Sequence, residues 1–123
     1  MQKTILVVDD DEDMLAAIYG VLSPRYHVTL AVDGVDGCEK AKEAPPPDLI
    51  VADIAMPRLD GISMVARMRE DEAMRCVPVI FLSGQVFVGS MLSVLGAGPF
   101  AYLAKTADPG LLVKKVGRAL RDN

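Results

Sequence analysis

Short, mostly apolar runs alternate along the chain with longer segments of mixed polarity. A run of about five residues rich in Val, Ile and Leu is typical of a strand that is buried on both faces of a parallel sheet. The pattern predicts five strands, at Thr4–Val8, His27–Ala31, Asp48–Ala52, Val77–Leu82 and Phe100–Leu103.

Between these runs, apolar residues recur at intervals of three and four, which is the spacing of one buried helix face. This spacing predicts helices from about Met14 to Leu22, at Val35–Ala44, at Ile62–Glu70, at Val86–Leu95, and from Asp108-Pro109 onward. In the last helix Asp108 is the expected N-cap, because Pro109 suits the first turn. The expected buried stripe of that helix consists of Leu111, Leu112, Val116 and Leu120.

A strand followed by a helix, repeated five times, predicts the α/β class with a doubly wound parallel sheet covered on both faces. The 123 residues fit one domain, residues 1–123. Ligands of such sheets bind beyond the carboxyl ends of the strands, where the strand order reverses. The residues that follow each strand are therefore the ones to search for chemistry.

Composition narrows the classes of partner. The formal net charge is −4, which gives no general attraction to nucleic acid or to an anionic membrane. The N-terminal segment lacks the apolar core of a signal peptide, and no apolar stretch is long enough to span a bilayer. We therefore expect a cytoplasmic protein with no direct nucleic-acid or membrane contact.

Acidic residues gather at the ends of two strands that are neighbours in a doubly wound sheet. Asp9 and Asp10 follow the first strand, and Asp53 follows the third. Carboxylates this close repel one another, so a positive group must offset them. Mg²⁺ is the natural cation for oxygen ligands, and Lys105 after the fifth strand is a second positive group. The pattern alone leaves a simpler role open, in which such acids only cap the following helices, as Asp13 could.

The same residues suit phosphoryl transfer. A carboxylate can attack a phosphoryl group and form an aspartyl-phosphate. The reaction needs in-line positioning and cancellation of charge on the phosphoryl oxygens. A metal and the Lys105 ammonium can supply that charge, and Ser83 at the end of the fourth strand can donate a hydrogen bond.

Four motifs in order carry a resemblance to a known family. They are VVDD at 7–10, DIAMPRLDG at 53–61, FLSG at 81–84 and YLAK at 102–105. With this pattern the chain resembles the receiver domain of bacterial response regulators, the chemotaxis-regulator-like family of two-component signalling. The resemblance covers nearly the whole chain and implies a single receiver domain with a flavodoxin-like sheet in the strand order 2-1-3-4-5.

The resemblance also implies roles for individual residues around a bound Mg²⁺. Asp53 matches the phosphoacceptor, Asp10 a direct metal ligand, and Asp9 an acid that acts largely through water. The backbone carbonyl of Ala55 matches the group that completes the metal site. Lys105 matches the lysine that binds the phosphoryl group.

Further roles concern signalling. Ser83 and Tyr102 match the hydroxyl and the aromatic residue that switch position on phosphorylation. The implied function is a switch that takes a phosphoryl group from a histidine kinase or phosphotransfer protein. It signals through the face formed by the fourth helix, fifth strand and fifth helix. The implied catalysis extends only to its own phosphoryl acceptance and hydrolysis. The uncharged, apolar segment 86–103 predicts a homodimer or partner surface.

Two departures from the family pattern support an alternative. Thr106 follows Lys105 where the family usually has proline, and residues 98–101 lack the usual acids. They favour a receiver-like interaction module that acts without phosphorylation, in which Asp53→Asn would leave partner binding intact. A flavin or nucleotide enzyme fits less well, because acids rather than a glycine-rich loop follow the first strand. The chain is either a stand-alone receiver or part of a longer regulator.

Overall fold

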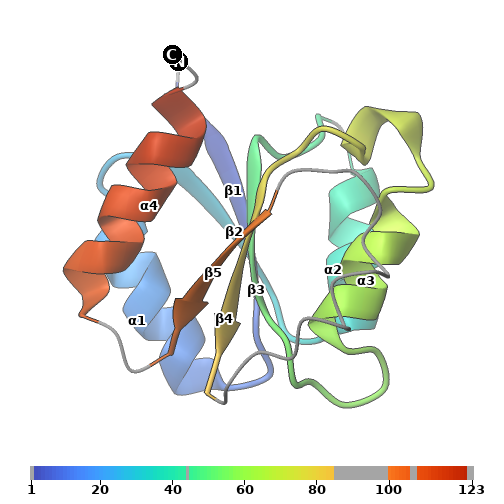
Figure 1. Cartoon of the computed structure of the whole chain (residues 1–123), viewed down its shortest axis with the longest axis horizontal. Coiled ribbons are helices and arrows are strands. Elements are labelled where there is room, and N and C mark those ends of the chain that lie inside the picture. The colour runs from blue at the N-terminus through green and yellow to red at the C-terminus, as the bar shows by residue number, and fades with distance from the viewer. Residues whose placement is uncertain (1, 44, 85–99, 106–107, 122–123) are drawn as a thin grey trace.

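The computed structural model describes residues 2–43, 45–84, 100–105 and 108–121. These residues contain one sheet of five parallel strands in the order β2-β1-β3-β4-β5, which confirms the predicted fold (Figure 1). The strands are β1 (Thr4–Val8), β2 (His27–Ala31), β3 (Leu49–Asp53), β4 (Val79–Ser83) and β5 (Phe100–Ala104). The predicted helix at Val86–Leu95 lies outside the described residues.

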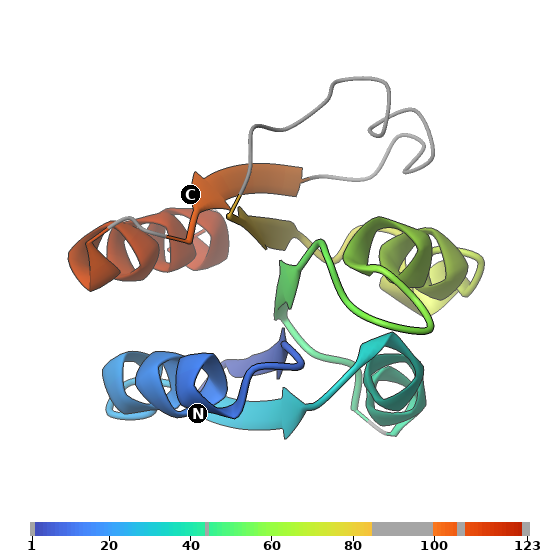
Figure 2. The ribbon, with the colours of Figure 1, turned by 90° about the horizontal axis from the view of Figure 1, so that it is seen from below.

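Within the described residues, helices cover both faces of the sheet, two on each side (Figures 1 and 2). On one face lie α1 (Glu12–Leu22) and α4 (Pro109–Arg121), and on the other lie α2 (Gly34–Lys42) and α3 (Gly61–Met68). A short 3-10 helix, η1 (Glu72–Met74), lies between α3 and β4. None of the helices in the described ranges has the length and apolar character needed to cross a membrane.

The strands β1, β3 and β4 each contribute alternate residues to two separate hydrophobic cores. In β1, Leu6 and Val8 pack toward α2 and α3, while Ile5 and Val7 pack toward α1 and α4. The same alternation runs through β3 and β4 because successive side chains of a strand point to opposite faces. The continuous apolar runs of the sequence follow from this arrangement, since both faces of the central strands are buried.

Two strands begin and end later than the sequence pattern predicts. Asp48 precedes β3, and its carboxylate accepts a hydrogen bond of 2.8 Å from the backbone N–H of Thr4. Val77 belongs to the turn before β4, where its N–H donates to the carbonyl of Met74 at 3.3 Å. As a result, Asp53 and Ser83 are the last residues of their strands and are held by strand pairing.

The structure corrects one predicted helix cap and agrees with another. The N-cap of α1 is Asp11 and not Asp13, because the Asp11 carboxylate accepts the N–H groups of Asp13 and Met14. Asp108 does accept the N–H of Gly110 at 2.9 Å, as an N-cap should.

The buried stripe of α4 is narrower than predicted. It consists of Leu112, Val116 and Leu120, which are spaced four residues apart, whereas Leu111 is 47% exposed. Leu111 lies one position from Leu112, about 100° around the helix, and so misses the core.

These two adjacent leucines give a matched test of the core. We expect Leu112→Ala to lower the free energy of unfolding by about 2–5 kcal/mol, because it removes buried apolar volume. Leu111→Ala should change it by less than about 0.5 kcal/mol, since the side chain is largely in water. Urea unfolding followed by circular dichroism measures both, and equal costs for the two variants would contradict the assigned core.

Candidate functional site

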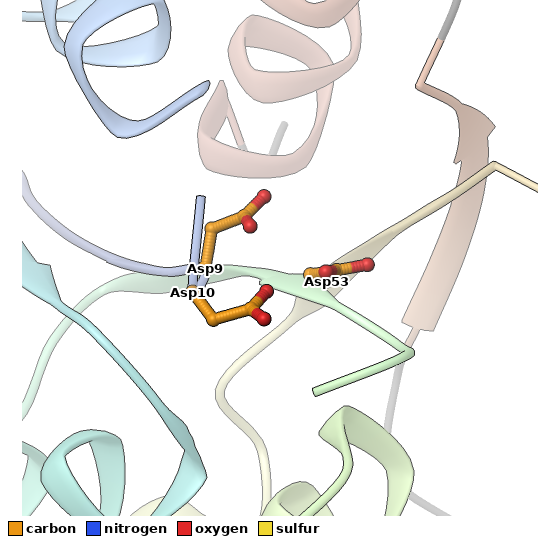
Figure 3. A group of neighbouring side chains, drawn as sticks. All are labelled: Asp9, Asp10 and Asp53. Atoms are coloured by element: carbon orange, nitrogen blue, oxygen red, sulfur yellow. The ribbon is translucent and has the colours of Figure 1, made fainter. Parts of the chain in front are cut away.

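Three aspartates gather at the carboxyl ends of β1 and β3 (Figure 3). Asp9 and Asp10 follow β1 directly, and Asp53 is the last residue of β3. One carboxylate oxygen from each lies within 4.8 Å of the other two. The structure therefore brings together the acids that the strand order predicted to meet.

The backbone of the sheet fixes the two buried members of this cluster. Asp9 is fully buried, and its N–H donates to the carbonyl of Ala31 at 3.1 Å, one step beyond the end of β1. Asp53 is 4% exposed and lies in register with Leu82 of β4. Asp10, in contrast, is exposed. The cluster thus has a buried side built on the sheet and one side that opens to water.

Lys105 reaches the cluster from the end of β5. Its Nζ lies 3.2 Å from Oδ2 of Asp9 and 3.2 Å from Oδ2 of Asp53. Its backbone N–H donates to the carbonyl of Ser83 at 2.9 Å, so the strand pairing of β4 and β5 continues to this residue. This hydrogen bond positions the lysine backbone although threonine and not proline follows it. Thr106 itself lies outside the described residues.

The electrostatics of the cluster are unbalanced. Burial raises the pKa of the Asp9 carboxyl, and the negative charge of Asp53 raises this pKa further. The hydrogen bond from the N–H of Asp11 lowers the pKa of Asp9 but does not cancel the rise. For Lys105, burial alone would lower the pKa. The hydrogen bond to Asp53 and the charges of both buried carboxylates outweigh burial and raise the pKa of Lys105. The lysine therefore stays an ammonium ion, and one ammonium faces three carboxyl groups.

The donor set fits a small divalent cation. Three ionised carboxylates and one ammonium leave an excess of two negative charges, which a divalent ion would cancel. Mg²⁺ prefers oxygen ligands and usually keeps several waters while it binds one or two carboxylates. The exposed position of Asp10 leaves room for such waters. The residues present therefore fit Mg²⁺, with Asp9, Asp10 and Asp53 as its candidate ligands.

Of the other predicted site residues, Ser83 and Ala55 lie at the same edge of the sheet, and Tyr102 lies in the middle of β5. Ser83 ends β4 and is 9% exposed. Tyr102 is half-buried in β5, in register with Phe81. Ala55 lies in the loop between β3 and α3, two residues after Asp53. Their places agree with the predicted roles, which stay predictions.

The sequence analysis missed an ion pair beside this site. The guanidinium of Arg58, in the β3–α3 loop, pairs with the carboxylate of Asp33, which caps α2. The pKa of Asp33 is lowered, first by the N–H of Asp36 and further by Arg58. The pair joins residues 25 apart in sequence, so no local signal could have revealed it.

Comparison with known proteins gives a consistent result. A family model described as the response regulator receiver domain matches residues 5–117. The chain is 41% identical over 118 residues to the transcriptional regulatory protein PrrA of Mycobacterium tuberculosis, covering 95% of this chain and 49% of PrrA. It is 38% identical over 112 residues to the hybrid signal transduction histidine kinase D of Dictyostelium discoideum, covering 91% of this chain and 7% of that protein. The chain therefore spans half or less of the length of these relatives.

Solved structures agree with the fold. The chemotaxis protein CheY4 of Vibrio cholerae superposes with a TM-score of 0.88 at 25% identity, covering 98% of this chain and 100% of that structure. A CheY-like receiver domain protein of Methanospirillum hungatei also gives a TM-score of 0.88 at 25% identity, with coverage of 99% and 96%.

The raised pKa of Asp9 predicts how stability depends on pH. Its folded-state pKa lies above the ordinary value of 3.8, so ionised Asp9 disfavours folding, and the penalty disappears as the pH falls. In the absence of metal we expect Asp9→Asn to raise the thermal unfolding midpoint at neutral pH. The gain should shrink as the pH falls toward the ordinary pKa of 3.8, because wild-type Asp9 takes up its proton in the folded state at a higher pH than in the unfolded state.

Thermal unfolding in EDTA across this pH range measures the effect. Asp11→Asn is the control, because it removes an exposed charge two residues away and keeps a side chain that can cap α1. A lower midpoint for Asp9→Asn than for wild type at neutral pH would contradict the electrostatic account.

Proposed function

The chain belongs to the response regulator receiver domain family, and from this premise we propose that it is a phosphorylation switch in which Asp53 accepts a phosphoryl group with Mg²⁺ bound. One observation carries the proposal. The ammonium of Lys105 lies 3.2 Å from the Asp53 carboxylate, beside a carboxylate cluster whose oxygens suit a divalent ion. A nucleophile, a place for a cation and a fixed positive charge therefore occupy one edge of the sheet.

Each group has a chemical task in the proposed transfer. An oxygen of Asp53 forms a bond to phosphorus while the bond to the donor breaks, and the donor atom keeps the electron pair. Negative charge spreads over the phosphoryl oxygens in the transition state. The Lys105 ammonium and the Ser83 hydroxyl, at the ends of neighbouring strands, would stabilise charge on these oxygens, and bound Mg²⁺ would neutralise the remaining charge. Asp10 and Asp53 would hold the ion directly, Asp9 through water, and Ala55 through its carbonyl.

We further propose that the acid cluster reports to a distant face through β4 and β5. Ser83 ends one strand, and Tyr102 lies in the other, two residues before Ala104, which pairs with Ser83. A movement of Ser83 toward a phosphoryl group would therefore act on the strand that carries Tyr102. The output surface would be β5 with α4 and segment 86–99, which lies outside the described residues. A second copy of the chain, forming a homodimer, or a partner protein would bind to this surface.

The proposed phosphoryl donor is a histidine kinase or a phosphotransfer protein. Two of the matched relatives are named as histidine kinases, of which this chain resembles only a small part. Others are named as transcriptional regulatory proteins, of which it resembles about half. A segment similar to this chain thus occurs both in proteins named as histidine kinases and in proteins named as transcriptional regulators. The rest of the signalling route stays a proposal.

The alternative function, an interaction module independent of phosphorylation, rests on two departures in sequence. One was the absence of proline after Lys105, yet the lysine lies within reach of both buried carboxylates. The other was segment 98–101, of which residues 98 and 99 lie outside the described residues. The geometry therefore favours the switch over the module.

Phosphoryl acceptance can be tested directly. We expect the protein, incubated with Mg²⁺ and a small acyl phosphate, to gain the mass of one phosphoryl group. The gain should be lost in Asp53→Asn, because the amide is not a nucleophile toward phosphorus, and lost when EDTA removes Mg²⁺. Intact mass spectrometry measures both.

The matched control is Asp71→Asn. Asp71 caps η1 away from the cluster, and asparagine caps equally well, so this variant should gain the same mass as wild type. No gain in wild type would refute the proposed function, as would a gain in Asp53→Asn equal to that of wild type.

A further inference from the structure

An ion pair ties the β3–α3 loop, residues 54–60, to the start of α2. The Nη2 of Arg58 contacts Oδ2 of Asp33. The Asp33 side chain is only 9% exposed, whereas that of Arg58 is 65% exposed. A largely exposed cation thus reaches down to a carboxylate that is nearly removed from water.

The carboxylate end of this pair is fixed. Oδ1 of Asp33 accepts the N–H of Asp36 at 2.8 Å and so caps α2. Asp36 in turn accepts the N–H of Val32 at 3.1 Å and lies 3.4 Å from the ammonium of Lys40. That ammonium also donates to the carbonyl of Leu30 at 2.6 Å. Arg58 therefore pairs with a group that is anchored to both β2 and α2.

The arginine end adopts an unusual backbone conformation. Arg58 has a φ of 69°, and among the described residues it is the one non-glycine residue in the left-handed region. Glycine adopts this conformation without steric cost, but a residue with a side chain does not. Arginine at this position therefore needs a compensating interaction, and the pair with Asp33 provides one.

The loop is also packed tightly at both ends. A Cβ on Gly61 would lie 2.1 Å from the carbonyl oxygen of Asp53, and one on Gly34 would lie 2.3 Å from that of Leu59. The N–H of Gly61 donates to the carbonyl of Ile54 at 2.8 Å. The backbone of this loop is thus pressed against the strand end that carries Asp53 and against the start of α2. Between these contacts, Met56 and Leu59 pack against the hydrophobic core, and the side chain of Arg58 adds an ion pair on the outer side of the loop.

We propose that the Asp33–Arg58 pair positions the β3–α3 loop, and with it the carbonyl of Ala55, for cation binding at the aspartate cluster. This inference rests on the proposed Mg²⁺ site. Arg58 and Asp33 touch no metal ligand; they act through the backbone between Asp53 and Gly61. They are positioning residues, comparable to the outer-shell groups that orient metal ligands elsewhere.

Two variants break the pair without disturbing the surrounding fold. Arg58→Gly removes the cation and suits the left-handed backbone, so the loop loses its anchor and not its conformation. Asp33→Asn keeps an oxygen for the cap of α2 and turns an amide N–H₂ toward Arg58. Asp33→Asn should lower the thermal midpoint modestly, because the ionised carboxylate loses its pair with Arg58. Both variants should remain folded at the temperature of the titration, which circular dichroism checks, so a change in Mg²⁺ affinity reports positioning and not unfolding.

The signs of the effects distinguish positioning from simple electrostatics. Loss of a positive charge should strengthen the binding of a cation, and loss of a negative charge should weaken it. Electrostatics alone therefore predicts opposite effects for Arg58→Gly and Asp33→Asn. Positioning predicts that both variants bind Mg²⁺ more weakly, by about tenfold for loss of an outer-shell contact.

Isothermal titration of the metal-free protein with Mg²⁺ measures these affinities without any phosphoryl donor. We expect both single variants to lose affinity and the double variant to lose no more than either, because the two residues act through one contact. Arg58→Lys retains the charge and should restore most of the affinity. Arg25→Ala is the control, since it removes an exposed positive charge before β2, at the other end of the sheet.

Three outcomes would overturn the proposal. Stronger Mg²⁺ binding by Arg58→Gly would leave only an electrostatic effect, and unchanged binding by both variants would show that the loop needs no anchor. In either case wild type still binds Mg²⁺, and the proposed function stands. Absence of saturable Mg²⁺ binding by wild type would overturn the proposed metal site and the positioning role together.

Discussion

Two buried carboxylates, Asp9 and Asp53, share one ammonium group, and the rest of the site depends on this imbalance. Burial of charge is unfavourable unless it is compensated, and Lys105 contacts both carboxylates but carries only one positive charge. Asp10, on the exposed side, adds a third negative charge. The fold thus maintains a local excess of negative charge at one edge of the sheet. Such an excess is costly in the absence of a ligand and favours a divalent cation.

The sheet holds this arrangement with backbone hydrogen bonds at each strand end. Asp9, Asp53 and Lys105 lie at the ends of three different strands, and the backbone of each is hydrogen-bonded or paired to the neighbouring strand. The like charges of Asp9 and Asp53 therefore cannot move apart to relieve their repulsion. Polar groups placed in advance at a strand edge are the kind of organisation that phosphoryl transfer requires, because its transition state needs charge in fixed positions. The fixed positions that make the cluster costly in free energy are therefore the same ones that the proposed phosphoryl transfer would use.

The sequence predicted the fold well because its signals are local. Apolar runs and helical spacing identified the five strands, and the strand order followed from the family pattern. The sequence was less informative where tertiary contacts decide. Asp11 rather than Asp13 caps α1, and Leu111 faces water. The pair of Arg58 with Asp33 depends on two loops that meet only after the sheet has formed, so no run of residues could reveal it.

The central claim is that the three aspartates form one cation site, and carboxyl ¹³C NMR during a Mg²⁺ titration tests it most directly. The side-chain carboxyl resonances of Asp9, Asp10 and Asp53 should shift together along one saturable curve. Those of Asp71 and Asp108, which cap other elements, should not follow that curve. Equal, non-saturating shifts at all exposed carboxylates, with none specific to the cluster, would contradict the account.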